Sequence, residues 1–137
     1  MTAFALLIGR CGLSQREAAA FLSVRIDTVK SWSVGRNRAP DGAIDELRAL
    51  SAKIEKAAAE GLRILRKNRA QEIELGLASD DSEAQSIGWP CVGAQAAAFG
   101  LMIARSTKKI RVVPRGTTLA TAAAADVYDA TNPHHLK

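Results

Sequence analysis

The stretch that most constrains the fold runs from Leu13 to Pro40, LSQREAAAFLSVRIDTVKSWSVGRNRAP. It opens with Ser-Gln-Arg-Glu at 14–17, a capping box in which a serine hydroxyl and a glutamate carboxylate satisfy free amides at the start of a helix. Small and apolar residues then recur at helical spacing, and the pair Ser23-Val24 interrupts them after about two turns. The stretch therefore predicts two short helices joined by a tight break and followed by a basic loop.

The second short helix is expected to run from about Ile26 to Ser33. Val29 and Trp32 lie three residues apart on the side that would be buried, so Trp32 is interpreted as a core residue. Charged and polar side chains occupy the other side and the residue before the helix: Arg25, Asp27, Lys30 and Ser31. The helix would thus present a face of mixed charge to a partner.

This stretch resembles the Cro/C1-type (Xre-family) helix-turn-helix of phage repressors. The residues that carry the resemblance are Gln15, Ala19, Leu22, Val24, Val29, Trp32, Gly35, Arg36 and Pro40. The resemblance covers about residues 3–50. Ser23 departs from the pattern, because the family usually has glycine at this left-handed turn position, and a residue with a side chain costs about 1 kcal/mol there.

The resemblance implies a sequence-specific transcriptional repressor that binds an inverted repeat in double-stranded DNA as a homodimer and regulates its own phage or mobile-element operon. In such a motif the N-terminal end of the second helix meets base edges in the major groove. The predicted base contacts are Arg25, Ile26, Asp27, Lys30 and Ser31. Their types suit the task, because arginine and lysine donate to guanine, aspartate accepts from cytosine, serine serves either, and isoleucine contacts the thymine methyl.

The sequence leaves plainer interpretations open for three of these residues. Arg25 could contact a phosphate rather than a base. Asp27 could stabilise the positive end of the helix dipole. Ile26 could be partly buried.

A second set of residues is predicted to contact DNA phosphates. The resemblance places this set at the start of the first short helix and in the basic loop: Ser14, Gln15, Arg16, Arg36, Asn37 and Arg38. A helix N-terminus favours an anion independently of any family. The basic loop could instead be ordinary solvated surface. As phosphate contacts, these residues would give affinity and salt dependence rather than sequence preference.

The distribution of charge agrees with a nucleic-acid partner. The net charge of the chain is +5, but residues 1–70 contain 13 Lys and Arg against 7 Asp and Glu, whereas residues 71–137 contain 6 against 7. All the surplus positive charge therefore lies in the half with the helix-turn-helix pattern. Alone this would show little, since many solvated helices are basic.

The rest of the chain predicts mainly helices. Apolar residues at helical spacing predict a helix from Ala3 to Cys11. Another is expected from Pro40-Asp41 to about Asn68, either as one long helix leading to a partner surface or as two consecutive helices packing on their own domain. A nearly all-apolar helix is expected from Val92 to Ala104, buried or at an interface, and a last one from Leu119 to about Tyr128.

Two strands are expected, at Ala70–Ala78 and Lys108–Pro114, while Ser79–Ser82 and Ile87–Pro90 are interpreted as loops. Because two strands do not make a self-sufficient sheet, they should pair with the same strands of a second subunit or pack beneath the long helix.

The predicted fold class is mainly α with a small β component. A four- to five-helix Cro/C1-type domain with a long exit helix would occupy residues 1–69, and a strand-helix-strand-helix dimerisation region residues 70–130. Residues 131–137 would form a flexible tail. The second region also resembles the C-terminal part of small phage regulators that include anti-CRISPR-associated repressors. Aromatic residues make up only 4% of the chain, so the core is expected to be thin and completed by a second subunit.

Several classes of protein are not expected from the sequence. Cys11 and Cys91 lack histidine partners at ligand spacing and are interpreted as buried thiols of a cytoplasmic protein. His134 and His135 are interpreted as solvated. No apolar run is long enough to span a membrane, and the start of the chain lacks the basic segment of a signal peptide. No catalytic motif, metal site or cofactor is predicted.

Two other functions remain open. The chain could be an antitoxin, with the same DNA-binding motif fused to a segment that neutralises an unknown protein. It could also be a module whose basic helices bind an acidic protein or RNA without reading a sequence. Trp89, next to Pro90, has no assigned role.

Overall fold

The structure is a computed structural model and describes residues 1–116. The first half of the chain forms four helices: α1 (Ala3–Arg10), α2 (Gln15–Leu22), α3 (Ile26–Val34) and α4 (Asp41–Lys67). The second half contributes β1 (Glu72–Leu77), α5 (Asp81–Ser86), α6 (Val92–Arg105) and β2 (Lys109–Pro114). The described residues are therefore mainly helical with a small sheet, as the sequence predicts.

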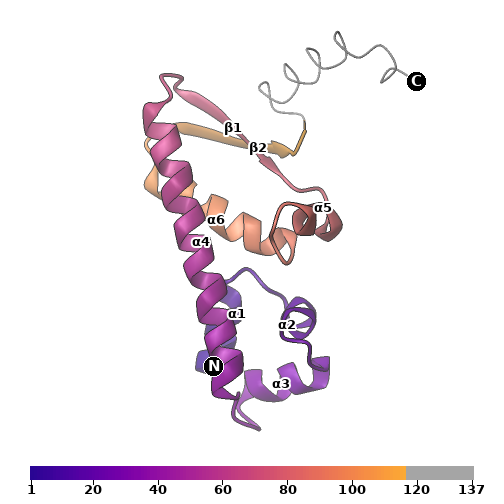
Figure 1. Cartoon of the computed structure of the whole chain (residues 1–137). Helices are drawn as coiled ribbons and strands as arrows, with labels where there is room; N and C mark the ends of the chain where they lie inside the picture. The colour runs from indigo at the N-terminus through magenta and orange to yellow at the C-terminus, as the bar shows by residue number, and fades with distance from the viewer. Residues whose placement is uncertain (117–137) are drawn as a thin grey trace, which may run out of the picture.

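The longest helix, α4, runs the length of the described structure (Figure 1). Its 27 residues are unbroken, and at 1.5 Å per residue they span about 40 Å. Buried residues recur every three or four positions along it: Leu47, Leu50, Ile54, Ala58, Leu62 and Leu65. The helix is thus a single long one rather than two consecutive helices, but its C-terminal half packs on α6 and the strands of its own chain.

Helices α1 to α3 pack around the N-terminal part of α4 (Figure 1). The predicted capping box is present, because the Ser14 hydroxyl accepts from the Glu17 amide at 3.1 Å and the Glu17 carboxylate accepts from the Ser14 amide at 2.8 Å. The break after α2 falls at Ser23, whose φ of 56° lies in the left-handed region. The predicted boundaries of α1 and α3 agree with the structure to within one residue.

The two strands pair with each other in parallel, with Ile73 opposite Ile110 and Leu75 opposite Val112. The connection between them passes through α5 and α6, as a parallel pair requires. Ile73, Leu75 and Ile110 pack in a cluster with the C-terminal part of α4 and with Met102 of α6. Of the two predicted arrangements, packing against the long helix is thus the one observed within the chain.

The segment Ser79–Ser82 is not simply a loop, so this prediction was wrong. Asp80 caps the short helix α5 by accepting from the Glu83 amide at 2.8 Å, and the Glu83 carboxylate accepts from the Ser79 amide at 3.2 Å. These end contacts, rather than apolar periodicity, stabilise a helix of only six residues. The predicted last helix at 119–128 and the tail at 131–137 lie outside the described residues.

The second half of the chain contributes to the core of the first. Cys91, Ala94 and Ala98 of the α6 region lie in the same buried cluster as Phe4, Val29 and Leu47. Where the α1–α2 turn meets α6, Gly12 and Gly93 are so close that a Cβ on either would overlap the other's carbonyl oxygen. Two glycines therefore allow this close approach of α6 to the helices that carry the predicted site.

Candidate nucleic-acid interface

The buried side of α3 is built as the sequence predicts. Val29 is fully buried, and Trp32 is half-buried with its ring edge-to-face against Phe4 of α1, at 5.4 Å between centroids. The Thr2 hydroxyl interacts with the Trp32 and Ser33 carbonyl oxygens at 3.2 and 3.0 Å. These contacts join α3 to the start of α1 and fix which side of α3 faces solvent.

The solvent side of α3 presents most of the predicted base-contact residues. Arg25, Asp27 and Lys30 are exposed, and their side chains have no hydrogen bond or ion pair with any described residue. Arg25 is the N-cap residue and Asp27 lies in the first turn, so both are at the end of α3 that would enter a groove. Asp27 is also well placed to stabilise the helix dipole, so its plainer interpretation stands beside the functional one.

Ile26 and Ser31 are less available than these three residues. Ile26 is half-buried and packs against the core cluster, which agrees with the alternative interpretation of partial burial. The rest of its side chain is exposed to solvent. The Ser31 hydroxyl accepts from the Asn37 side-chain amide at 2.8 Å. This hydrogen bond joins the predicted base-contact face to the predicted phosphate loop.

The predicted phosphate contacts lie at two places. Ser14, Gln15 and Arg16 are at the N-terminal end of α2, where the Ser14 hydroxyl is already engaged in capping. Arg36, Asn37 and Arg38 lie in the loop after α3, and all three are exposed. Gly35 starts this loop with a φ of 84°, a left-handed conformation that favours glycine.

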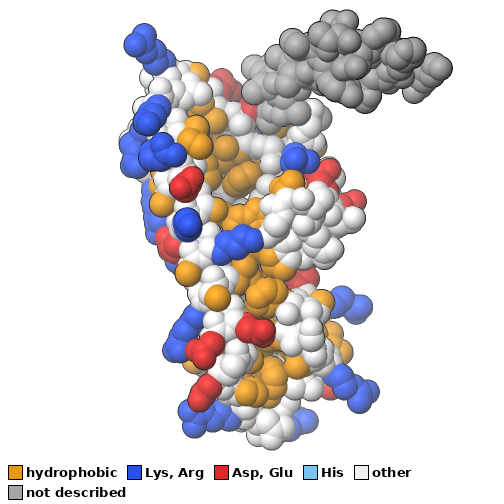
Figure 2. Space-filling view, in the orientation of Figure 1, with side chains coloured by type: hydrophobic (Ala, Val, Ile, Leu, Met, Phe, Trp, Pro, Cys, Tyr) orange, Lys and Arg blue, Asp and Glu red, His pale blue; other side chains and the backbone are white. Residues whose placement is uncertain are grey.

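The unpaired cations of this region are Arg16, Arg25, Lys30, Arg36 and Arg38, none of which has an ion pair in the described part of the chain. Figure 2 shows Lys and Arg side chains around the lower end of the molecule, where α3 lies in Figure 1. An exposed cation without a partner keeps its full charge available to a phosphate. The region can therefore attract a polyanion.

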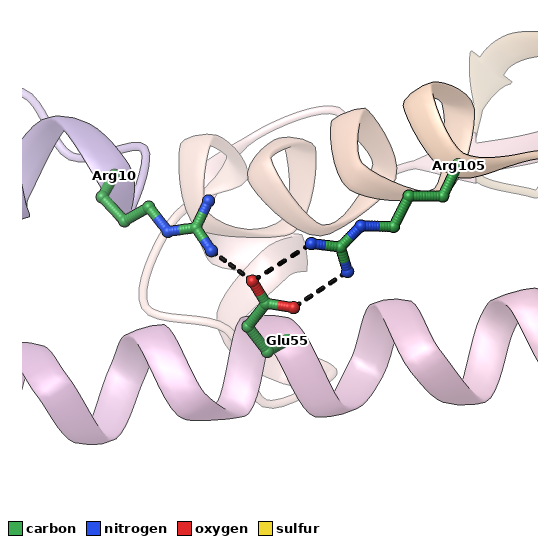
Figure 3. A network of polar contacts seen from close by, with 3 residues as sticks. All are labelled: Arg10, Glu55 and Arg105. Carbon is green, nitrogen blue, oxygen red and sulfur yellow. Dashed lines mark hydrogen bonds and ion pairs between the residues drawn. The ribbon is translucent and has the colours of Figure 1, made fainter.

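Arginines in the middle of the molecule are arranged differently. Glu55 of α4 accepts from Arg10 of α1 and, at 3.0 Å, from Arg105 of α6 (Figure 3). The hydrogen bond from Arg105, together with the charges of both arginines, lowers the pKa of the Glu55 carboxyl below its usual value. This network, which we call the Glu55 network, joins three helices and leaves no free cation.

The sequence interpretation overlooked a second group of exposed cations at the far end of α4: Arg63, Arg66, Lys67 and Arg69. The signal was the local run RILRKNR at 63–69. Cations in the last turn of a helix are favourable for the helix dipole, which is a structural reason for their presence. The length of α4 separates them from α3, so they do not extend the same surface.

The two cysteines and Trp89 have structural explanations. Cys11 and Cys91 are buried free thiols, as predicted, and burial raises the pKa of both. Trp89, which had no assigned role, packs against the core with Lys53 Nζ 5.0 Å above its ring.

In residues 1–116 no three His, Cys, Asp or Glu side chains are grouped to hold a metal ion. None of the described helices is long and apolar enough to cross a membrane.

No model of a known protein family matches the chain, and no curated protein matches it.

Proposed function

We propose that the chain is a transcriptional repressor of the Cro/C1 type that binds an inverted-repeat operator in double-stranded DNA as a homodimer. The observation that carries the proposal is the two-sided construction of α3. Val29 and Trp32 anchor it to the core, while Arg25, Asp27 and Lys30 face solvent and make no side-chain hydrogen bond or ion pair within residues 1–116. A helix held in this way can offer its outer side to the major groove, which admits one α-helix.

Specificity would come from α3 and affinity from its neighbours. Arg25 and Lys30 would donate to guanine, and Asp27 would accept from cytosine. Arg16 at the start of α2 and Arg36 in the loop would contact the phosphates on either side, which sets register but reads no sequence.

A second copy of the chain would supply the second half-site. One short helix makes too few base contacts to select a site in a genome, whereas a two-fold dimer doubles them. Exposed apolar side chains near the C-terminal end of α4, on α6 and on β2 support a partner surface there: Ile64, Ile103 and Val112. The two recognition helices would then lie about 34–36 Å apart, or a multiple of that spacing.

Selection from a pool of randomised duplexes tests this proposal without knowledge of the operator. We expect the bound fraction to converge on an inverted repeat with half-sites one or two helical turns apart. Lys30→Ala should change the selected bases, whereas Lys56→Ala, at an exposed position on α4, should select the same ones. A pool that remains random after repeated rounds would refute sequence-specific binding.

The cations at the far end of α4 favour one alternative, a module that binds nucleic acid without reading its sequence. Arg63, Arg66 and Lys67 are exposed and distant from α3. In that case, replacing all three of these residues with glutamate would abolish nucleic-acid binding, while Lys30→Ala would have no effect on it. The repressor proposal predicts the opposite ranking.

A further inference from the structure

A cavity of about 710 Å³ lies next to the predicted phosphate loop. Its walls come from the start of α1, the end of α3 with the following loop, and the first two turns of α4. None of the five predicted base-contact residues lines it. The cavity is therefore a feature separate from the outer face of α3, and its volume is in the range of small-molecule sites.

One side of the cavity is apolar and aromatic. Phe4 and Trp32 meet edge-to-face there, and Ile44 of α4 completes this side. Trp32 and Ile44 are only half-buried, so part of their apolar surface is open to the cavity. This side suits an aromatic or branched aliphatic group.

The other side carries charges of both signs. Arg38 and Asp41 have no hydrogen bond or ion pair through their side chains with any residue of the described chain, whereas Arg48 and Asp45 pair with each other at 3.6 Å. Two arginines and two carboxylates balance in the lining, so the cavity holds no surplus positive charge for a phosphate chain, which carries only negative charge. A molecule with one positive and one negative group would instead satisfy both Arg38 and Asp41.

We propose that this cavity binds a small zwitterion with an apolar body, the chemistry of a free amino acid, and that this ligand weakens DNA binding. The ligand carboxylate would lie at Arg38, its amine at Asp41, and its side chain against Trp32. The second half of this proposal rests on the proposed function, because Arg38 is also a predicted phosphate contact.

Arg38 connects the cavity to the DNA-binding surface. A ligand carboxylate and a DNA phosphate would compete for the same guanidinium group. The Asn37–Ser31 hydrogen bond joins the loop that carries Arg38 to the outer side of α3, so a change at Arg38 on ligand binding would be passed to the predicted base-contact face. Because coupling between two sites is reciprocal, DNA should weaken ligand binding by the same factor.

The protein contains its own reporter for this site. Trp89→Phe leaves Trp32 as the single tryptophan, and Trp89 lies outside the cavity. We expect L-phenylalanine or L-leucine to change Trp32 fluorescence in a saturable way. Phenylacetate and phenethylamine, which each carry one of the two charges, should bind at least tenfold more weakly than L-phenylalanine. The absence of a saturable change with both amino acids, or equal binding of all the probes, would overturn the proposal.

Variants separate the ligand site from the DNA site. Arg38→Gln and Asp41→Asn should each weaken amino-acid binding at least tenfold, while Arg36→Gln, in the same loop but outside the cavity, should bind it normally. The amino acid should lower the DNA affinity of the wild type and of Arg36→Gln, but not that of Asp41→Asn. Unchanged ligand binding by Arg38→Gln and Asp41→Asn would contradict the assigned contacts.

The ligand titrations contain no DNA, so the two proposals fail separately. A protein that binds the amino acid but no DNA would contradict the proposed function and leave the cavity as a ligand site. A protein that binds DNA but none of the amino acids would contradict only the cavity. Thermal melting of each variant shows that loss of binding is not loss of folding.

Discussion

The cations around α3 and those of the Glu55 network differ in what they contact. Around α3, five Arg and Lys side chains have no ion pair with any described residue. Between α1, α4 and α6, Arg10 and Arg105 both contact one carboxylate, that of Glu55 (Figure 3). The same residue types therefore join helices in one region, whereas in the other they have no ion pair within residues 1–116.

This difference indicates where substitutions should affect stability and where they should affect binding. Changes at the junction of α1, α4 and α6 should alter folding, and changes around α3 should alter DNA affinity with little effect on folding.

The largest effect is expected where α6 meets the α1–α2 turn. Gly12→Ala should lower the free energy of unfolding by about 3 kcal/mol, because its Cβ would overlap the Gly93 carbonyl oxygen and its φ of +73° disfavours a side chain. Gly9→Ala is the control, since its Cβ would meet no atom within 4 Å beyond its chain neighbours and the backbone of α1. Denaturant unfolding measures the free energy of unfolding of both variants. Equal stability of the two would show that the close approach of Gly12 to Gly93 is unimportant.

Lys30→Ala should have the next largest effect, on binding alone. Loss of one base contact should weaken binding to the selected duplex by about 2 kcal/mol, and the midpoint of unfolding should not change. Fluorescence anisotropy measures the affinity, and Lys56→Ala is the matched exposed control. If Lys30→Ala weakened binding to every duplex equally, Lys30 would be a phosphate contact.

Ser23→Gly should stabilise the fold by about 1 kcal/mol, because glycine adopts the left-handed conformation of Ser23 without steric cost. Ser23→Ala keeps this cost and should give no gain. Calorimetry of the two variants checks the difference. A Ser23→Gly variant no more stable than the Ser23→Ala variant would place the strain elsewhere.

The smallest effect is expected at the Glu55 network, because its members are partly exposed. Since the folded-state pKa of Glu55 is lowered, its contribution is fully present above the ordinary glutamate pKa and is lost as the pH falls through the lowered value. The melting midpoint of Glu55→Gln should therefore lie slightly below the wild-type value near neutral pH and approach it in acid. A difference that grew in acid would contradict this assignment.

Local signals predicted the region around α3 well. The capping pair Ser14 and Glu17 and the left-handed Ser23 depend on neighbours in the sequence, and the spacing of Val29 and Trp32 set the buried side of α3. Side-chain types alone could not show that Ile26 is half-buried or that Ser31 is engaged by Asn37.

The contacts between the first and second halves of the chain could not be predicted, because they join residues that are distant in the sequence. The approach of Gly12 to Gly93 has no local pattern, since a glycine after a helix is equally typical of an ordinary stop. The parallel pairing of β1 with β2 likewise depends on the packing of α4 and α6 against them. The helix α5 depends on the hydrogen bond that the Asp80 carboxylate accepts from the Glu83 amide, and Asp side chains make similar hydrogen bonds in turns.

The most direct test of DNA binding by the unpaired cations around α3 is the salt dependence of DNA affinity. It is measured for the wild type, Arg36→Ala and Arg105→Gln, on the selected duplex and on a scrambled duplex. We expect Arg36→Ala to weaken binding to both duplexes and to reduce the slope of log K against log salt by about 1, whereas Arg105→Gln should change neither the affinity nor the slope. Equal effects of the two substitutions, or equal affinity of the wild type for both duplexes, would contradict the proposed function.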